Sequence, residues 1–85
     1  MELLFFGNKK CYDCLKVRYL LDRSNIPYNY IDAFDEKNDI ICDEYGVDEI
    51  PHIILKNDNK LIVFENIGEL SEDDFINYIA KNFGC

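Results

Sequence analysis

The apolar residues near the start of the chain occur first as an unbroken run and then at helical spacing. Positions 3–6 are all Leu or Phe, which predicts a buried strand over Glu2 to Phe6. From Leu15 to Arg23 apolar residues recur every three or four positions, which is typical of a helix with one face packed on a sheet. The apolar stripe of this predicted helix is formed by Cys14, Val17, Leu20 and Leu21.

A proline separates this helix from the next predicted strand. Pro27 cannot continue a helical hydrogen-bond ladder and biases the residue before it towards extended geometry. The segment Tyr28 to Ala33 is therefore predicted as a second strand. A strand, a helix and a strand in this order imply a right-handed crossover with the two strands parallel.

The middle of the chain predicts a second, short helix. It covers Asp35 to Tyr45 and carries the apolar residues Ile40, Ile41 and Tyr45. Gly46 follows at the position where many helices end in a left-handed residue.

The last part of the chain predicts a hairpin and a final helix. His52 to Leu55 and Leu61 to Phe64 are apolar runs joined by Asn and Asp residues that tolerate a turn, so they form an antiparallel pair. Ser71 can cap the helix that follows, and Gly84 can end it. The predicted order of elements is β-α-β-α-β-β-α.

Composition and charge narrow the class of protein. The 85 residues suffice for one small domain, residues 1–85. Seventeen Asp and Glu against nine Lys and Arg give a formal net charge of −8, which disfavours nucleic acid as a partner. We expect no targeting or membrane segment, because the chain shows neither a basic leader nor a long apolar stretch. The four cysteines are not spaced as in a secreted disulfide framework, so we expect a cytoplasmic protein.

Candidate chemistry lies at the start of the first predicted helix, where the sequence reads Cys11-Tyr12-Asp13-Cys14. Two cysteines three positions apart on a helix share one face and are close enough for a disulfide. The unpaired N–H groups and the positive dipole end of a helix N-terminus favour a thiolate on the first cysteine. We therefore predict a redox-active disulfide between Cys11, the nucleophile, and Cys14, a buried resolving thiol.

Three other residues could carry redox or metal chemistry. Cys42 is expected to be a small core residue, and Cys85 a free thiol at the chain end. His52 is expected to be a strand residue without a chemical role. The alternative is that His52, which follows Pro51, lies near the cysteines and influences a proton there.

Two separate stretches resemble one known superfamily. The first runs from Phe5-Phe6-Gly7 to the Cys11–Cys14 motif and its helix, and the second is the segment Glu44 to Ile53, which contains Ile50-Pro51. Together they make the chain similar to a small, glutaredoxin-sized member of the thioredoxin and glutaredoxin superfamily. The resemblance implies an α/β minimal thioredoxin fold with a mixed four-stranded sheet flanked by helices on both faces. The implied spatial order of the strands is second, first, third, fourth.

The resemblance also implies roles for the residues around Pro51. The Ile50–Pro51 peptide bond would be cis and would lie against the cysteine pair. The backbone of Ile50 would offer a strand-like docking edge to a substrate. The implied activity is that of a thiol–disulfide oxidoreductase, which reduces protein disulfides through a mixed disulfide.

The electron donor is left open by the residues around the cysteines. The site has neither the Trp-Cys-Gly-Pro-Cys of typical thioredoxins nor the Cys-Pro-Tyr-Cys of dithiol glutaredoxins. The single Gly68 stands where glutaredoxins have a Gly-Gly pair, which is closer to thioredoxins and favours a reductase of the thioredoxin reductase type. The alternative is glutathione, held by Lys9, Tyr12 and Gly68. The plainer interpretation of Lys9 and Tyr12 is a solvated charge and a partly exposed ring.

Two other classes of function remain as alternatives. A zinc site would need further ligands from Cys42, His52 or Cys85, because the chain has no second paired cysteine motif. A non-catalytic interaction domain would bind partners through its acidic surface, although the intact Cys11 and Cys14 argue against it. We expect a monomer with no tightly bound cofactor.

Overall fold

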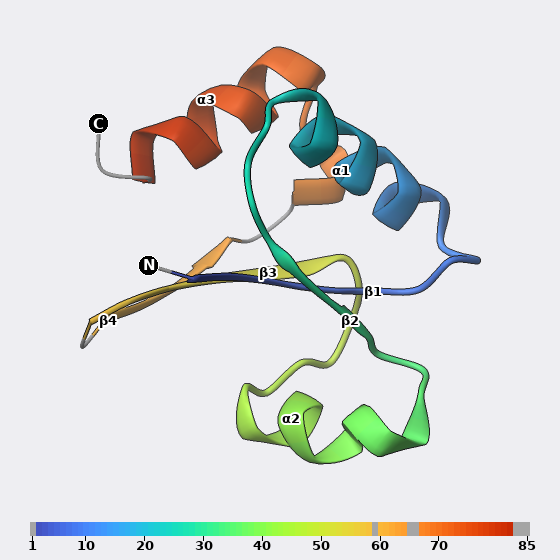
Figure 1. Cartoon of the computed structure of the whole chain (residues 1–85). Helices are drawn as coiled ribbons and strands as arrows, with labels where there is room; N and C mark the ends of the chain where they lie inside the picture. Colours follow the sequence, from blue (N-terminus) through green and yellow to red (C-terminus); the bar gives the residue numbers. More distant parts are fainter. Residues whose placement is uncertain (1, 59, 65–66, 83–85) are drawn as a thin grey trace.

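The computed structural model describes residues 2–58, 60–64 and 67–82, and its elements follow the predicted order β-α-β-α-β-β-α (Figure 1). The strands are β1 (Glu2–Gly7), β2 (Asn29–Asp32), β3 (His52–Asn57) and β4 (Lys60–Phe64). The helices are α1 (Tyr12–Arg23), α2 (Asp39–Glu44) and α3 (Glu72–Asn82), and the 3₁₀ turns are η1 (Glu36–Asn38) and η2 (Ile67–Glu69). None of the helices in these ranges is long and apolar enough to cross a bilayer.

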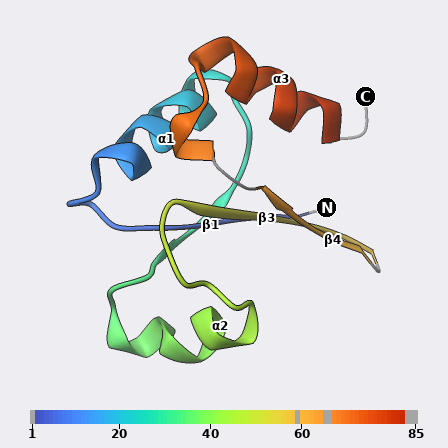
Figure 2. The ribbon, with the colours of Figure 1, turned by 180° about the vertical axis from the view of Figure 1, so that it is seen from behind.

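The four strands form one mixed sheet in the spatial order β2-β1-β3-β4, as the resemblance implied. Strand β1 runs parallel to β2 and antiparallel to β3, and β3 is antiparallel to β4. Figures 1 and 2 show α1 and α3 on one face of this sheet and α2 on the other. The chain therefore has the minimal thioredoxin fold, in which helices cover both faces of the sheet.

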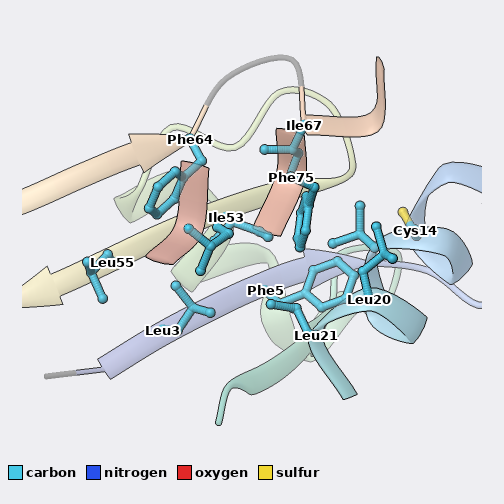
Figure 3. Packing of buried hydrophobic residues seen from close by; sticks show 12 residues of the cluster. Leu3, Phe5, Cys14, Leu20, Leu21, Ile53, Leu55, Phe64, Ile67 and Phe75 are labelled. Atoms are coloured by element: carbon cyan, nitrogen blue, oxygen red, sulfur yellow. The ribbon is translucent and has the colours of Figure 1, made fainter. Parts of the chain in front are cut away.

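The larger core lies between the sheet and the helices α1 and α3 (Figure 3). Side chains alternate across a strand, so Leu3 and Phe5 of β1 point to this face. They meet the apolar stripe of α1 together with Phe75 and Ile79 of α3. The stripe is buried at every predicted position: Cys14, Val17, Leu20 and Leu21.

The smaller core lies on the α2 face of the sheet. It contains Leu4 and Phe6 of β1, and Ile41 and Tyr45 pack against it. Ile40, the other apolar residue named for this helix, does not join this core, because its side chain is 82 % exposed. Neighbouring residues point in different directions on a helix, whereas residues four apart share a face.

The second helix is shorter than predicted. Helix α2 starts only at Asp39, after η1, instead of at Asp35. The Asp35 side chain accepts a hydrogen bond from the Lys37 backbone N–H at 3.1 Å. The Asn38 side-chain amide donates to the Asp32 backbone carbonyl at 2.9 Å. These side-chain bonds hold the segment as a turn instead of a continuous helix.

The predicted caps agree with the structure where it describes them. Gly46 has a φ of +64°, the left-handed conformation expected after α2. The Ser71 hydroxyl accepts a hydrogen bond from the Asp74 N–H at 3.2 Å and so caps α3. The helix end predicted at Gly84 lies outside the described residues.

We expect Ile79→Ala to lower the free energy of unfolding by about 2–5 kcal/mol, because Ile79 is fully buried in the larger core. The matched control is Ile40→Ala, the same chemical change at an exposed position, which should cost less than about 0.5 kcal/mol. Urea unfolding of both variants measures the difference. Equal effects would contradict the assignment of these two side chains to a buried and an exposed face.

Candidate redox site

Helix α1 begins at Tyr12, so the cysteine pair lies at the start of the helix as predicted, and Cys11 is the N-cap. The backbone of Cys11 is extended, with φ −92° and ψ 117°, and its Sγ accepts a hydrogen bond from the Cys14 N–H at 3.2 Å. The Cys11 side chain is only half-buried. Cys11 therefore presents a sulfur at a helix N-terminus where a partner can reach it, as predicted for the nucleophile.

Cys14 lies one turn into α1 and is 1 % exposed. A Cβ at Gly7 of β1 would lie 3.2 Å from the Cys14 Sγ, so any side chain at Gly7 would press on this sulfur. Burial, reinforced by the hydrogen bond with Cys11, raises the pKa of the Cys14 thiol to about 12. Both sulfurs are free thiols in this structure. Cys14 is thus an enclosed, protonated thiol, as expected for a resolving residue.

The Ile50–Pro51 peptide bond is cis, as the resemblance implied. The register of β1 and β3 pairs Phe6 with His52, so the end of β1 that leads to Cys11 lies beside the start of β3. Ile50 packs against the same apolar cluster as Cys11. In the part of the chain that the structure describes, neither the N–H nor the C=O of Ile50 makes a hydrogen bond. This backbone edge is therefore open to an extended peptide next to the cysteines.

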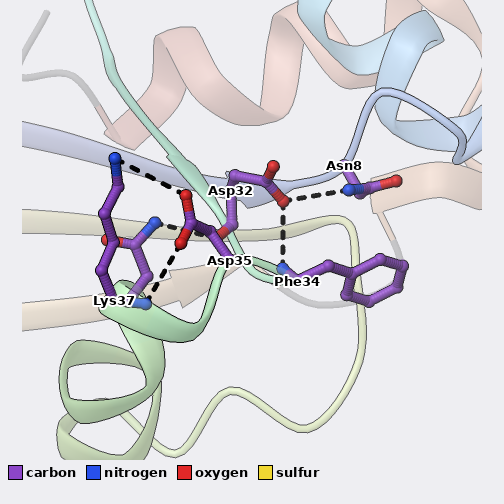
Figure 4. A network of polar contacts seen from close by, with 6 residues as sticks. Asn8, Asp32, Phe34, Asp35 and Lys37 are labelled. Atoms are coloured by element: carbon purple, nitrogen blue, oxygen red, sulfur yellow. Dashed lines mark hydrogen bonds and ion pairs between the residues drawn. The ribbon is translucent and has the colours of Figure 1, made fainter.

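Asn8 holds the loop that precedes the cysteines, a role that sequence reasoning missed (Figure 4). It is a buried polar residue, 6 % exposed. Its Oδ1 accepts a hydrogen bond from the Lys10 N–H at 2.9 Å, and its Nδ2 donates to Asp32 Oδ1 at 3.0 Å. Its carbonyl accepts a hydrogen bond from the Cys11 N–H at 3.1 Å. Asn8 is therefore a positioning residue for Cys11.

The partner of Asn8 stands at the end of β2. The same oxygen of Asp32 accepts a hydrogen bond from the Phe34 N–H at 3.0 Å (Figure 4). The bond from Asn8, followed by the bond from Phe34, lowers the pKa of Asp32 below its ordinary value. Asn8 and Asp32 are 24 positions apart, and both residue types are common in turns, so no local pattern could pair them. The parallel pairing of Gly7 with Asp32 brings them together.

The residues named for glutathione lie around the first turns of α1. Lys9 and Tyr12 are exposed, Tyr12 by 81 %. Gly68 lies in η2, which packs against α1. The Lys16 ammonium of α1 donates a hydrogen bond to the Leu70 carbonyl at 2.7 Å, just after η2. These contacts place η2 beside the cysteine helix, and a glutathione site there stays a prediction.

His52 and Cys42 lie on the opposite side of the sheet from Cys14. The His52 ring meets Phe6 edge to face, with ring centroids 6.0 Å apart, and Phe6 belongs to the smaller core. This placement argues against a proton role at the cysteines. Cys42, which was predicted as a small core residue, is half-buried and packs against the smaller core.

The described residues do not form a metal site. Among residues 2–58, 60–64 and 67–82, no three His, Cys, Asp or Glu side chains gather in an arrangement that could hold a metal ion. Cys14 belongs to the larger core, whereas Cys42 packs against the smaller core on the opposite face of the sheet. Cys85 lies outside these ranges.

Comparison with solved structures identifies the fold. The structure of a malarial protein superposes with a TM-score of 0.70 at 23 % identity, over 95 % of this chain and 94 % of that chain. Thioredoxin 1 from the thermophilic eubacterium Thermosipho africanus TCF52B superposes with a TM-score of 0.61 at 22 % identity, over 95 % of this chain and 92 % of that chain. No protein-family model and no curated protein matches the sequence. The chain has a thioredoxin-like fold, with the close cysteine pair Cys11 and Cys14 at the start of its first helix.

We expect Asn8→Ala to loosen the loop before Cys11, because the change removes both side-chain hydrogen bonds of Asn8. The loss should lower the free energy of unfolding by about 1–3 kcal/mol and speed hydrogen exchange at the Lys10 amide. The control is Asn77→Ala on the exposed face of α3, which should change neither quantity. Unaltered exchange at Lys10 in Asn8→Ala would refute the positioning role.

We expect His52 to make the protein less stable in mild acid. Burial lowers the pKa of His52 against the opposing pull of Asp48 and Glu49, and Nε2 is enclosed without a hydrogen-bond partner among the described residues. The unfolded chain therefore takes up the proton first. As the pH falls below the ordinary value of 6.5, stability is lost until the pH passes the lowered pKa of the folded state. The loss is at most about 1.4 kcal/mol for each pH unit.

Urea unfolding at about pH 7.5 and about pH 5.5, on either side of the ordinary histidine pKa, measures this effect. His52→Gln does not titrate, so it should lose less stability than the wild type over the same interval. An equal loss in both proteins would mean that other groups set the pH dependence.

Proposed function

We propose that this chain is a thiol–disulfide oxidoreductase that reduces disulfide bonds in protein partners. One arrangement carries the proposal: the Cys11 sulfur is accessible, Cys14 is enclosed one turn further along α1, and the unpaired backbone of Ile50 lies at the same end of the sheet. A reactive sulfur, a second sulfur held back and an open peptide edge are what disulfide exchange with a protein substrate requires.

In the first step, the thiolate of Cys11 attacks one sulfur of the substrate disulfide. A bond forms between Cys11 and that sulfur while the substrate S–S bond breaks, and the other substrate sulfur leaves as a thiolate. An extended segment of the substrate paired with the backbone of Ile50 would hold its disulfide at Cys11.

In the second step, Cys14 loses its proton and attacks the Cys11 sulfur. The Cys11–Cys14 disulfide forms, the mixed disulfide breaks, and the second substrate sulfur is released, so that two electrons have passed to the substrate. Because burial raises the pKa of Cys14 above its ordinary value, its proton needs an acceptor. The substrate thiolate released in the first step can take this proton, so the cycle needs no further protein base.

A donor of two electrons must then reduce the Cys11–Cys14 disulfide again. We take the donor to be a reductase of the thioredoxin reductase type; with glutathione, two molecules would be oxidised to one glutathione disulfide. The deciding assay follows insulin reduction with NADPH and thioredoxin reductase, and separately with NADPH, glutathione and glutathione reductase. Turnover only with glutathione would reassign the donor and give Lys9, Tyr12 and Gly68 a binding role.

We expect Cys11→Ser to abolish insulin reduction, because the attacking sulfur is lost. Cys14→Ser should complete the first step and accumulate a mixed disulfide between Cys11 and the substrate, which non-reducing electrophoresis and mass spectrometry detect. Cys85→Ser serves as the control, since it removes a thiol outside the pair and should retain full turnover. Full activity of Cys11→Ser would refute the proposed function.

A further inference from the structure

A groove of about 490 Å³ opens beside Ile50, and it is lined by the loop after β2, by α2 and by the loop before β3. Phe34, Val47 and Ile50 supply apolar surface to its lining. Phe34 is 69 % exposed, which is unusual for so large an apolar side chain. Exposed aromatic residues at the wall of a recess commonly anchor a binding partner.

The groove adjoins the redox site at Ile50, and hydrogen bonds connect its opposite wall to the loop before Cys11. Ile50 forms one wall and packs against the same apolar cluster as Cys11. Phe34 belongs to the other, and its N–H donates to Asp32, which in turn accepts a hydrogen bond from Asn8 (Figure 4). The Asn8 carbonyl binds the Cys11 N–H. A substrate segment that lies along the backbone of Ile50 is therefore adjacent to the groove.

The charged groups that line the groove all have the same sign. They are the exposed carboxylates of Asp39, Asp43, Asp48 and Glu49. Within residues 2–58, 60–64 and 67–82, none of these carboxylates has an ion-pair or hydrogen-bond partner, and no Lys or Arg lines the groove. Uncompensated carboxylates favour a cationic partner and repel an anionic one, including a second copy of this chain with its net charge of −8.

We propose that the groove receives the segment next to the disulfide of a protein substrate, and that this segment carries Lys or Arg beside an apolar side chain. The proposal rests on the proposed function and adds the class of substrate to it. The apolar side chain would lie on Phe34 and Val47, and the cationic groups would meet the carboxylates of the rim. Because these carboxylates are exposed, their main effect is on the rate of encounter, which salt weakens.

The test uses two disulfide peptides that differ only in the residues flanking the cystine, two Lys in one and two Glu in the other. At low ionic strength we expect kcat/KM for the Lys peptide to exceed that for the Glu peptide by about tenfold or more, and high salt should shrink the ratio. The same peptides with reduced and alkylated cysteines give a second readout, binding by fluorescence anisotropy, which does not depend on turnover.

The groove variant combines Asp39→Asn, Asp43→Asn, Asp48→Asn and Glu49→Gln. The control variant combines Asp58→Asn, Glu69→Gln, Asp73→Asn and Asp74→Asn, an equal change of charge on the β3–β4 turn, on η2 and in the first turn of α3. The groove variant should lose the preference for the Lys peptide, and the control should keep most of it. Faster reduction of the Glu peptide by the groove variant would also report that it is folded.

The outcomes separate the two proposals. Reduction of both peptides at equal rates would overturn the proposed role of the groove, and so would a preference for the Lys peptide that survives in the groove variant. Either result would leave the proposed oxidoreductase activity in place. Reduction of neither peptide by the wild type would overturn the proposed function. In that case, equal binding of both alkylated peptides would overturn the groove as well, whereas preferential binding of the Lys peptide that is lost in the groove variant would support it.

Discussion

The burial of β1 on both faces is the constraint on which the rest of this structure depends. A strand with apolar residues at consecutive positions needs a covering layer on each side. Leu3 and Phe5 pack with α1 and α3, while Leu4 and Phe6 pack on the α2 side. Strands β2 and β3 pair with the two edges of β1 and satisfy its backbone groups, so β1 lies inside the sheet with its end directed at the cysteines.

The geometry of the cysteine site is set by the contacts made at the end of β1. Gly7 has no side chain, so Cys14 can pack directly on the strand. Asn8 then fixes the turn by binding Asp32 of the neighbouring strand, and the antiparallel pairing with β3 brings Ile50 to the same end of the sheet. Each of these contacts depends on how the strands of the sheet are paired. The difference in exposure between Cys11 and Cys14 is therefore a property of the whole fold, since the motif alone does not enclose a sulfur.

Most of the fold was predictable because local pattern and burial point to the same answer. The apolar run of β1, the stripe of α1, the cap at Ser71 and the left-handed Gly46 all agree with the structure. The errors occur where the local pattern is ambiguous. The second helix was predicted to start at Asp35, whereas side-chain hydrogen bonds of Asp35 and Asn38 hold its first residues as a turn. The sequence also did not show which of Ile40 and Ile41 faces the sheet, which the position of α2 decides.

The residues alone were enough to identify the cysteine pair and the helix that buries Cys14, because these features involve neighbours in the chain. The cis bond at Ile50–Pro51 was expected only from the family resemblance. The tertiary structure was needed to place His52 on the face opposite Cys14, to join Asn8 to Asp32, and to leave the backbone of Ile50 unpaired at the end of β1 that leads to Cys11. These features depend on strand order and register. A shift of one residue in register turns every side chain to the other face, and the packing of residues far apart in the chain prevents that shift.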